Sequence, residues 1–191
     1  MESFPRGEWA HTLGRVDHED QAASAVATLD ATRFRKAMGL FPTGVSIVTV
    51  GHGPSTFGVT VNAVTAISLE PMLVLISIAR SGRIRPRIEA AGAFGLSVLT
   101  DRQLDLCLTF ARSDRPEGVA AADMLGAVGS ATGTVLVNDA LMALECRLYD
   151  HMRGGDHELF LGEVLAIHHG ESDATPLVFY RGQFTRIGLP L

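Results

Sequence analysis

Short apolar runs broken by glycine or proline constrain the fold of this chain more than any other feature. Four runs of six to eight residues are rich in β-branched and other apolar side chains, at residues 45–50, 57–64, 72–79 and 93–100. Runs of this length and composition predict strands. Three further alternating segments predict strands at residues 140–152 and 157–169 and a final pair of short strands within 176–187. About seven strands with few helices between them favour a mainly β fold, a closed or nearly closed antiparallel barrel.

Helical patterns are fewer and shorter. Phe34, Met38 and Phe41 recur at helical spacing in residues 31–41, and Leu104 and Leu108 form a stripe in residues 101–112. We expect a loop and a short helix over residues 80–92 and mostly loop over residues 113–133. Residues 1–30 are expected to be an N-terminal extension, partly disordered or loosely helical, outside a domain at residues 31–191.

Composition excludes several classes of function. The 191 residues carry a formal net charge of −5, which argues against nucleic acid as the main partner. No apolar run approaches the ~20 residues that cross a bilayer, and the N-terminus has no apolar segment of a signal peptide. Cys107 and Cys146 both lie in apolar-periodic segments, which predicts two separate buried thiols and a reducing, cytoplasmic setting.

Familiar nucleotide and metal motifs are missing. A dinucleotide-binding fingerprint that starts at Gly51 and Gly53 would need glycine where Thr56 stands, and Lys36, the single lysine, lies in a helical pattern rather than a phosphate loop. Adjacent His168 and His169 would point to opposite faces of a strand. No set of Cys, His or carboxylate residues recurs at ligand spacing, so no metal site is expected.

Two polar constellations follow one another near the first strands. Pro42, Thr43 and Gly44 form a turn that either exposes backbone N–H groups to a ligand or simply ends a helix. In the next strand Thr60 and Asn62 share one face. Because asparagine is depleted in strands, Asn62 either binds the polar edge of a ligand or bonds to backbone.

Two further constellations carry charge. Ser81 and Arg83 follow a buried strand, where they either hold a phosphate or belong to a solvated basic face. The stretch GGDHELFLGEV, residues 154–164, places Asp156 and His157 between a glycine turn and a strand. A histidine there can donate a hydrogen bond, transfer a proton or face an anion, and Asp156 can fix its tautomer.

The order of these segments closely resembles the flavin reductase-like family. The resemblance rests on FRKAMGLFPTGVSIVT, FGVTVNAVTAISLEPMLVLISI, RSGRIR, FGLSVLTDRQLDLCLTFA, GGDHELFLGEV and PLVFYRGQFTRI, and it covers roughly residues 31–188. It implies an FMN-binding split barrel of the Greek-key type. It further implies a homodimeric NAD(P)H:flavin oxidoreductase that reduces FMN or FAD with NADH or NADPH and supplies reduced flavin to a partner monooxygenase.

The resemblance also implies roles for individual residues. Residues expected to contact the flavin are Pro42, Thr43, Gly44, Val45, Thr60, Val61, Asn62, Ala63, Ser68, Leu69, Ser77, Ala79, Ser81, Arg83, Phe110 and Ala111. Residues expected on the nicotinamide side are Asp156, His157, Tyr180 and Arg181, with His157 in the catalytic role.

This sequence departs from the family pattern at two positions, and three other functions remain alternatives. Met72 stands where many members have a second proline, and Leu99 stands where asparagine is common, which leaves the choice between FMN and FAD open. The rivals are a tightly flavin-bound electron carrier, a split-barrel flavoenzyme that reduces another acceptor, and a barrel that has lost flavin.

Overall fold

The computed structural model describes residues 30–171 and 173–188. The chain divides into two compact units, Met1–Arg35 and Lys36–Leu191. Helix α1 (Ala31–Met38) crosses that boundary, and it buries none of its side chains. The expected N-terminal extension lies almost wholly outside the described residues. The second unit holds the remaining described helices and strands.

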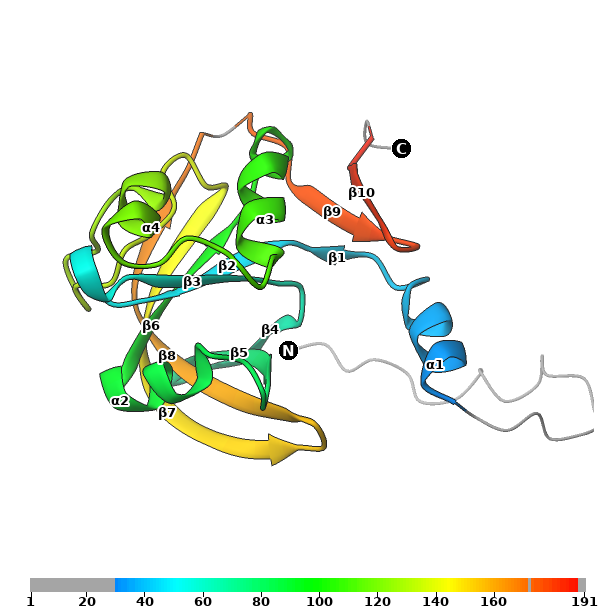
Figure 1. The fold of residues 1–191 in the computed structure, drawn as a ribbon, viewed down its shortest axis with the longest axis horizontal. Coiled ribbons are helices and arrows are strands. Elements are labelled where there is room, and N and C mark those ends of the chain that lie inside the picture. Colours follow the sequence, from blue (N-terminus) through cyan, green and yellow to red (C-terminus); the bar gives the residue numbers. More distant parts are fainter. Residues whose placement is uncertain (1–29, 172, 189–191) are drawn as a thin grey trace, which may run out of the picture. The chain divides into compact units, whose positions relative to one another are not determined.

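Seven antiparallel strands form the main sheet of the second unit, in the order β3-β2-β6-β7-β8-β5-β4 (Figure 1). Their bounds are β2 Ser46–Val50, β3 Phe57–Val61, β4 Val64–Leu69, β5 Met72–Ala79, β6 Ala93–Val98, β7 Met142–Gly154 and β8 His157–His169. The edge strands β3 and β4 are consecutive in the chain, joined only by Asn62 and Ala63. So short a connection brings the two edges of the sheet together, as an antiparallel barrel requires.

The interior of this barrel is the first of two apolar cores. Phe57, Ile76, Phe94 and Phe160 are fully buried in it, and helix α2 (Arg85–Ala91) closes one side with Ile88. Gly162 lies against Phe94, where a Cβ atom would come within 2.4 Å of the ring. Side chains alternate along the strands, so β5 turns Val74, Ile76 and Ile78 into the barrel and leaves the residues between them partly exposed.

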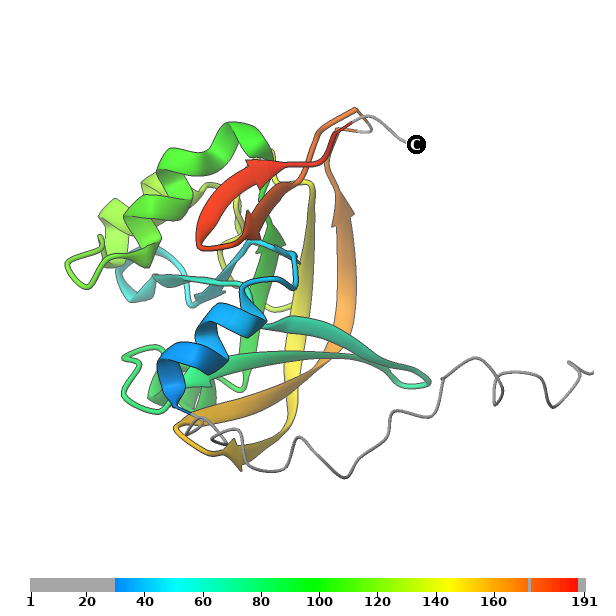
Figure 2. The ribbon, with the colours of Figure 1, turned by 90° about the vertical axis from the view of Figure 1, so that its right-hand side faces the viewer.

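A second layer covers the outer side of β2 and β3. It contains α3 (Leu104–Ala111), which follows the short helical turn η2 (Asp101–Gln103), and α4 (Gly118–Leu125), which packs on η1 (Gly53–Ser55). A three-stranded sheet in the order β1-β9-β10 completes it, with β1 at Thr43–Gly44, β9 at Leu177–Tyr180 and β10 at Gln183–Arg186 (Figure 2). Ile47, Leu99 and Phe110 are fully buried in this second core.

The sequence predictions of a mainly β barrel are confirmed, with two differences in its elements. We expected a single strand over residues 57–64, but β3 ends at Val61 and β4 starts at Val64. Residues 113–133 are mostly loop, as expected, but they also contain α4, which the sequence did not predict. Ala121 and Leu125 are buried on one side of α4, and this packing stabilises a helix in a Gly/Ala-rich segment.

The two cysteines are free and buried, as predicted. Cys107 lies in the second core and Cys146 in the barrel core. Burial raises the pKa of Cys107 to about 11 and that of Cys146 to about 12, so both remain thiols at neutral pH. Among the described residues, no helix is long and apolar enough to cross a membrane.

Candidate functional site

The two polar constellations near the first strands meet in the folded chain. Strand β2 pairs with β3 so that Ser46 lies opposite Val61, which brings the start of β2 beside the end of β3. The side-chain amide of Asn62 donates a hydrogen bond to Oγ1 of Thr43 over 3.3 Å. Asn62 is exposed in the single chain, and its amide oxygen takes no hydrogen bond within the part of the chain that the structure describes. The pair therefore presents an acceptor and a remaining N–H donor to a ligand.

A small pocket of about 170 Å³ adjoins this pair. Its lining residues are Val45, Thr60, Val61, Asn62, Phe179 and Phe184. The first four were expected from the sequence, whereas the two phenylalanines were not. Phe179 reaches the pocket because β9 pairs with β1, where Phe179 lies opposite Thr43. A polar edge beside apolar and aromatic walls suits a planar heterocycle.

Thr60 and Phe110 support the pocket from behind. The hydroxyl of Thr60 donates to the backbone oxygen of Cys107 over 2.7 Å and so ties β3 to α3. Phe110, three residues further along α3, is fully buried against Gly58. Its side chain thus packs inside the second core, while the neighbouring Ala111 is exposed at the end of the helix.

A continuous path of contacts leads from Asn62 to His157. The backbone N–H of Ser77 donates to the oxygen of Ala63 over 3.0 Å. Ser77 and Ala79 share one face of β5, and Ala79 lies directly opposite His157 of β8. Residues directly opposite in neighbouring strands share a face. Ser77, Ala79 and His157 therefore lie on one surface that starts at the Asn62–Ala63 connection.

The turn at Gly154–His157 explains the Asp-His pair that the sequence singled out. Gly155 occupies the first turn position with φ of 67°, a conformation that glycine adopts readily. Nδ1 of His157 lies 2.8 Å from Oδ1 of Asp156. An ionised carboxylate only accepts hydrogen bonds, so the Nδ1–H of the ring donates. The other nitrogen, Nε2, is then the acceptor of the neutral ring, and the side chain is 42% exposed.

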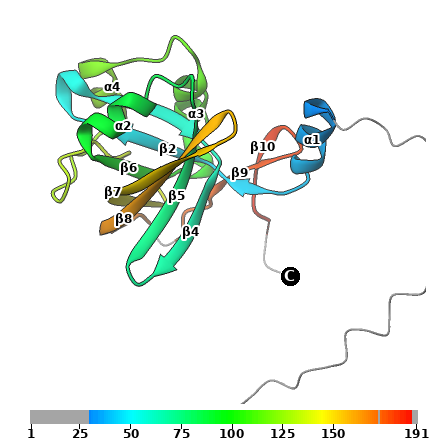
Figure 3. The same cartoon turned by 90° about the horizontal axis from the view of Figure 1, so that it is seen from below.

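Other expected residues lie farther along the surface. Ser68 and Leu69 are at the tip of the β4–β5 hairpin, which projects from the barrel (Figure 3), and Leu69 is 91% exposed. Tyr180 and Arg181 are at the β9–β10 turn, so strand pairing places them next to Phe179 and Thr43. Arg181 has φ of 53°, and its guanidinium lies 5.2 Å from the ring of Tyr180.

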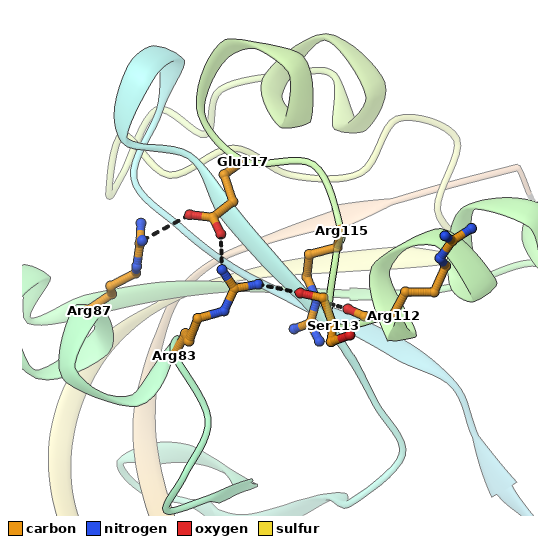
Figure 4. Close-up of polar contacts among 6 residues, drawn as sticks. All are labelled: Arg83, Arg87, Arg112, Ser113, Arg115 and Glu117. Atoms are coloured by element: carbon orange, nitrogen blue, oxygen red, sulfur yellow. Dashed lines mark hydrogen bonds and ion pairs between the residues drawn. The ribbon is translucent and has the colours of Figure 1, made fainter.

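Arg83 belongs to a cluster of charged side chains in which arginines of residues 80–87 meet Arg115 and Glu117 from a distant part of the sequence (Figure 4). Nη1 of Arg83 forms an ion pair with Glu117, and its Nη2 donates to the backbone oxygen of Ser113 over 2.6 Å. Arg87 pairs with the other oxygen of Glu117 at 3.0 Å.

The same arginines surround one buried aromatic ring. The guanidinium carbons of Arg83, Arg87 and Arg115 lie 5.3, 4.4 and 5.9 Å from the centre of the Phe57 ring. Burial and the neighbouring charge of Arg83 lower the pKa of Arg115. Three cations near one ring with one carboxylate leave an excess of positive charge, which is typical of an anion site.

No metal site emerges from the described residues. Among them, no group of three or more His, Cys, Asp or Glu side chains is placed to hold a metal ion. His168 lies on β8 at 2.9 Å from the buried carboxylate of Glu145, outside the surface described above.

Comparisons with known proteins converge on one family. A model described as the flavin reductase like domain matches residues 38–188. The NADH-dependent FMN reductase AsuE2 of Streptomyces nodosus subsp. asukaensis is 48% identical over 83% of this chain and 86% of its own length. The reductase subunit HsaB of a flavin-dependent monooxygenase from Rhodococcus jostii is 34% identical over 86% of this chain and 82% of its own.

A solved structure agrees with these relatives. The NADH:FAD oxidoreductase SgcE6 of Streptomyces globisporus, in complex with NAD and FAD fragments, superimposes with a TM-score of 0.77. It is 34% identical, and the match covers 87% of this chain and 98% of that one.

Proposed function

The chain belongs to the flavin reductase-like family, and on that basis we propose that it is an NADH-dependent flavin reductase that supplies reduced FMN or FAD to a partner monooxygenase. The observation that carries this proposal is the surface that joins Asn62 to His157. One end offers a polar edge and an apolar pocket for a flavin ring, and the other offers a histidine for a nicotinamide. A reductase needs both sites on one surface, because its two substrates react in contact.

The residues at the Asn62 end fit a flavin ring. The isoalloxazine edge carries N–H and C=O groups, which match the free oxygen and remaining N–H of the Asn62 amide. Val45, Val61 and Phe179 supply apolar walls. We assign Pro42, Gly44 and Ala63 to backbone contacts beside this edge, and Ser77 and Ala79 to the path of the ribityl chain.

The protein contributes position rather than acid–base chemistry. When both nucleotides are bound, they supply the redox chemistry, in which hydride passes from nicotinamide C4 to flavin N5. His157, held by Asp156, offers Nε2 as an acceptor for the amide N–H of the nicotinamide. The ring is half exposed, so Nε2 is accessible for that bond. The hydrogen bond to Asp156 keeps the ring proton on Nδ1 and leaves Nε2 as the acceptor. Tyr180 and Arg181 are assigned to support the bound nucleotides from the β9–β10 turn.

Ser81 and Arg83 are assigned to the flavin phosphate. The guanidinium of Arg83 lies within a cluster with excess positive charge, and Ser81 is exposed directly after β5. Arginine and hydroxyl groups together provide the charge-assisted hydrogen bonds that a phosphate requires.

We further propose that the active form is a homodimer. The 170 Å³ pocket is smaller than the ~300–1,000 Å³ of typical ligand sites, so one chain encloses only part of a flavin. The β4–β5 hairpin exposes Ile67, Leu69 and Met72 at 49, 91 and 50% of their surfaces. Such apolar exposure on a projecting hairpin suits a second copy that covers the flavin. Ser68 and Leu69 would then contact the flavin of that second copy.

The two buried thiols support a reducing, cytoplasmic setting for the protein.

An assay of NADH oxidation at 340 nm tests the function. Purified protein is mixed in air with NADH or NADPH and with FMN, FAD or no added flavin. Oxidation of NADH that requires added flavin and saturates with it supports the proposal, and the faster flavin identifies the preferred substrate. A protein that purifies with flavin but oxidises neither nucleotide would instead be an electron carrier.

A further inference from the structure

The arginine assigned to the flavin phosphate is already bound to an anion of the protein itself. Both terminal nitrogens of Arg83 are engaged, Nη1 by Glu117 and Nη2 by the backbone oxygen of Ser113 (Figure 4). A phosphate that binds a guanidinium in bidentate geometry uses two neighbouring nitrogens. If it takes the two terminal ones, it competes with Glu117 for Nη1 and with the backbone oxygen of Ser113 for Nη2.

Glu117 is placed to act as a substitute for a phosphate. Its two carboxylate oxygens divide between Arg83 and Arg87 and so bridge two guanidiniums. Among the ion pairs of the described residues, Glu117 is the carboxylate partner for this cluster, where Arg115 adds a third cation. Such a bridging anion offsets the repulsion between neighbouring cations, which is also what a bound phosphate does.

Glu117 can move away without loss of the helix that it precedes. It occupies the N-cap position of α4, but its side chain makes no capping hydrogen bond. The side chain is one-third exposed, and the side chain of Arg83 is half exposed. An ion pair at such exposure is weak enough to exchange its partner.

Resting on the proposed function, we propose that Glu117 competes with the flavin phosphate for Arg83. The competition weakens the binding of phosphorylated flavins and so favours the release of reduced flavin to the monooxygenase. Glu117 is thus a residue that sets affinity and exchange rate, and it has no part in hydride transfer.

The test compares the binding of FMN with that of riboflavin, which lacks the phosphate. Dissociation constants are measured by isothermal titration or by quenching of flavin fluorescence. We expect Glu117→Gln to tighten FMN binding about two- to fivefold, the factor that an exposed ion pair is worth, and to leave riboflavin binding unchanged. Glu117→Asn, with a side chain favoured at N-cap positions, should do the same and guards against an effect of helix fraying.

Glu171→Gln is the control. Glu171 pairs with Arg102 at 3.4 Å, so this variant removes one charge and one ion pair outside the arginine cluster and outside the proposed flavin surface. It should change the binding of neither flavin. A thermal unfolding curve for each variant confirms that the comparison is made between folded proteins.

A second set of variants, made in an Arg83→Met background, separates competition for Arg83 from direct repulsion between the charge of Glu117 and the phosphate. Arg83→Met should weaken FMN binding about tenfold or more and spare riboflavin, because a charged hydrogen bond to the phosphate is lost. In that background Glu117→Gln should not change the affinity for FMN any further. If Glu117→Gln still tightens FMN binding when Arg83 is absent, Glu117 acts only through its charge. If Glu117→Gln weakens FMN binding when Arg83 is present, Glu117 orients Arg83. Either result overturns the proposal. If Arg83→Met leaves FMN binding unchanged, the phosphate assignment of Arg83 itself fails.

Discussion

Replacement of Glu145 by glutamine tests how the buried carboxylate of β7 stabilises the fold. Glu145 is fully buried, and its Oε2 accepts hydrogen bonds from the backbone N–H of Ala131 at 2.9 Å and from the N–H and hydroxyl of Thr132 at 2.6 and 3.0 Å. Its Oε1 lies 2.9 Å from Nε2 of His168. The carboxylate thus fastens the loop before β7 onto the sheet.

Glu145→Gln should lower the free energy of unfolding by about 2–3 kcal/mol. The amide oxygen keeps the size and position of Oε2, but three hydrogen bonds lose the assistance of charge, each worth roughly 1 kcal/mol by the difference between charged and neutral bonds. Glu163→Gln is the control. Glu163 is on the paired strand β8, and it forms an ion pair with Arg147 at 2.5 Å on the surface. Its replacement should cost less than about 1 kcal/mol.

Urea unfolding at several pH values checks both the size and the sign of this effect. Burial opposes ionisation of Glu145, but hydrogen bonds from His168, Thr132 and Ala131 prevail and lower its pKa below the ordinary value of 4.5. The carboxylate therefore stabilises the fold above pH 4.5, and this contribution disappears as pH falls through the lowered pKa. The difference in the free energy of unfolding between the wild type and Glu145→Gln should become smaller in that range. The reasoning would be refuted if Glu145→Gln and Glu163→Gln lowered the free energy of unfolding equally at neutral pH, or if this difference grew in acid.

Three other predictions address the site and the domain boundary. His157→Ala should raise the KM for NADH far more than the KM for flavin. Steady-state kinetics measures both constants, with His157→Gln as the conservative control. Equal increases in the two KM values would remove His157 from the nicotinamide side. Asn62→Ala should weaken flavin binding by about 1–3 kcal/mol if the ring edge loses its partner, and a titration that finds unchanged affinity argues against that contact. Deletion of residues 1–30 should leave reductase activity largely intact in the 340 nm assay, whereas an inactive product would show that these residues belong to the domain.

The barrel was predictable because most strands are encoded by local pattern. β5 was predicted with the bounds Met72–Ala79 that the structure shows, since glycine and proline flank a nearly apolar run. β4 was missed because its sequence VTAISL mixes polar and apolar residues, and its pairing with β5 decides its conformation. The helix α4 was missed for a related reason. Its alanines permit a helix, but burial of Ala121 and Leu125 stabilises it.

The candidate site was predictable in its residue types and less so in its geometry. Thr43 and Asn62 were singled out separately, and their hydrogen bond depends on the pairing of β2 with β3. The aromatic wall at Phe179 and Phe184 depends on the pairing of β9 with β1 and β10, which no local pattern reveals. The repeated aromatics of LVFYRGQF were the signal that could have indicated it. The engagement of Arg83 with Glu117, 34 residues away, likewise requires the folded chain.

The burial of β2 on both faces has a consequence for how the molecule opens. All five of its residues, Ser46–Val50, are buried, because one face belongs to the barrel core and the other to the second core. If either core opened alone, one face of the shared strand β2 would become exposed to solvent. The two cores should therefore exchange their amide hydrogens as one cooperative unit. Thr43–Val45 leads directly into that strand. A flavin bound at this end should consequently slow hydrogen exchange in strands of the barrel that it never touches.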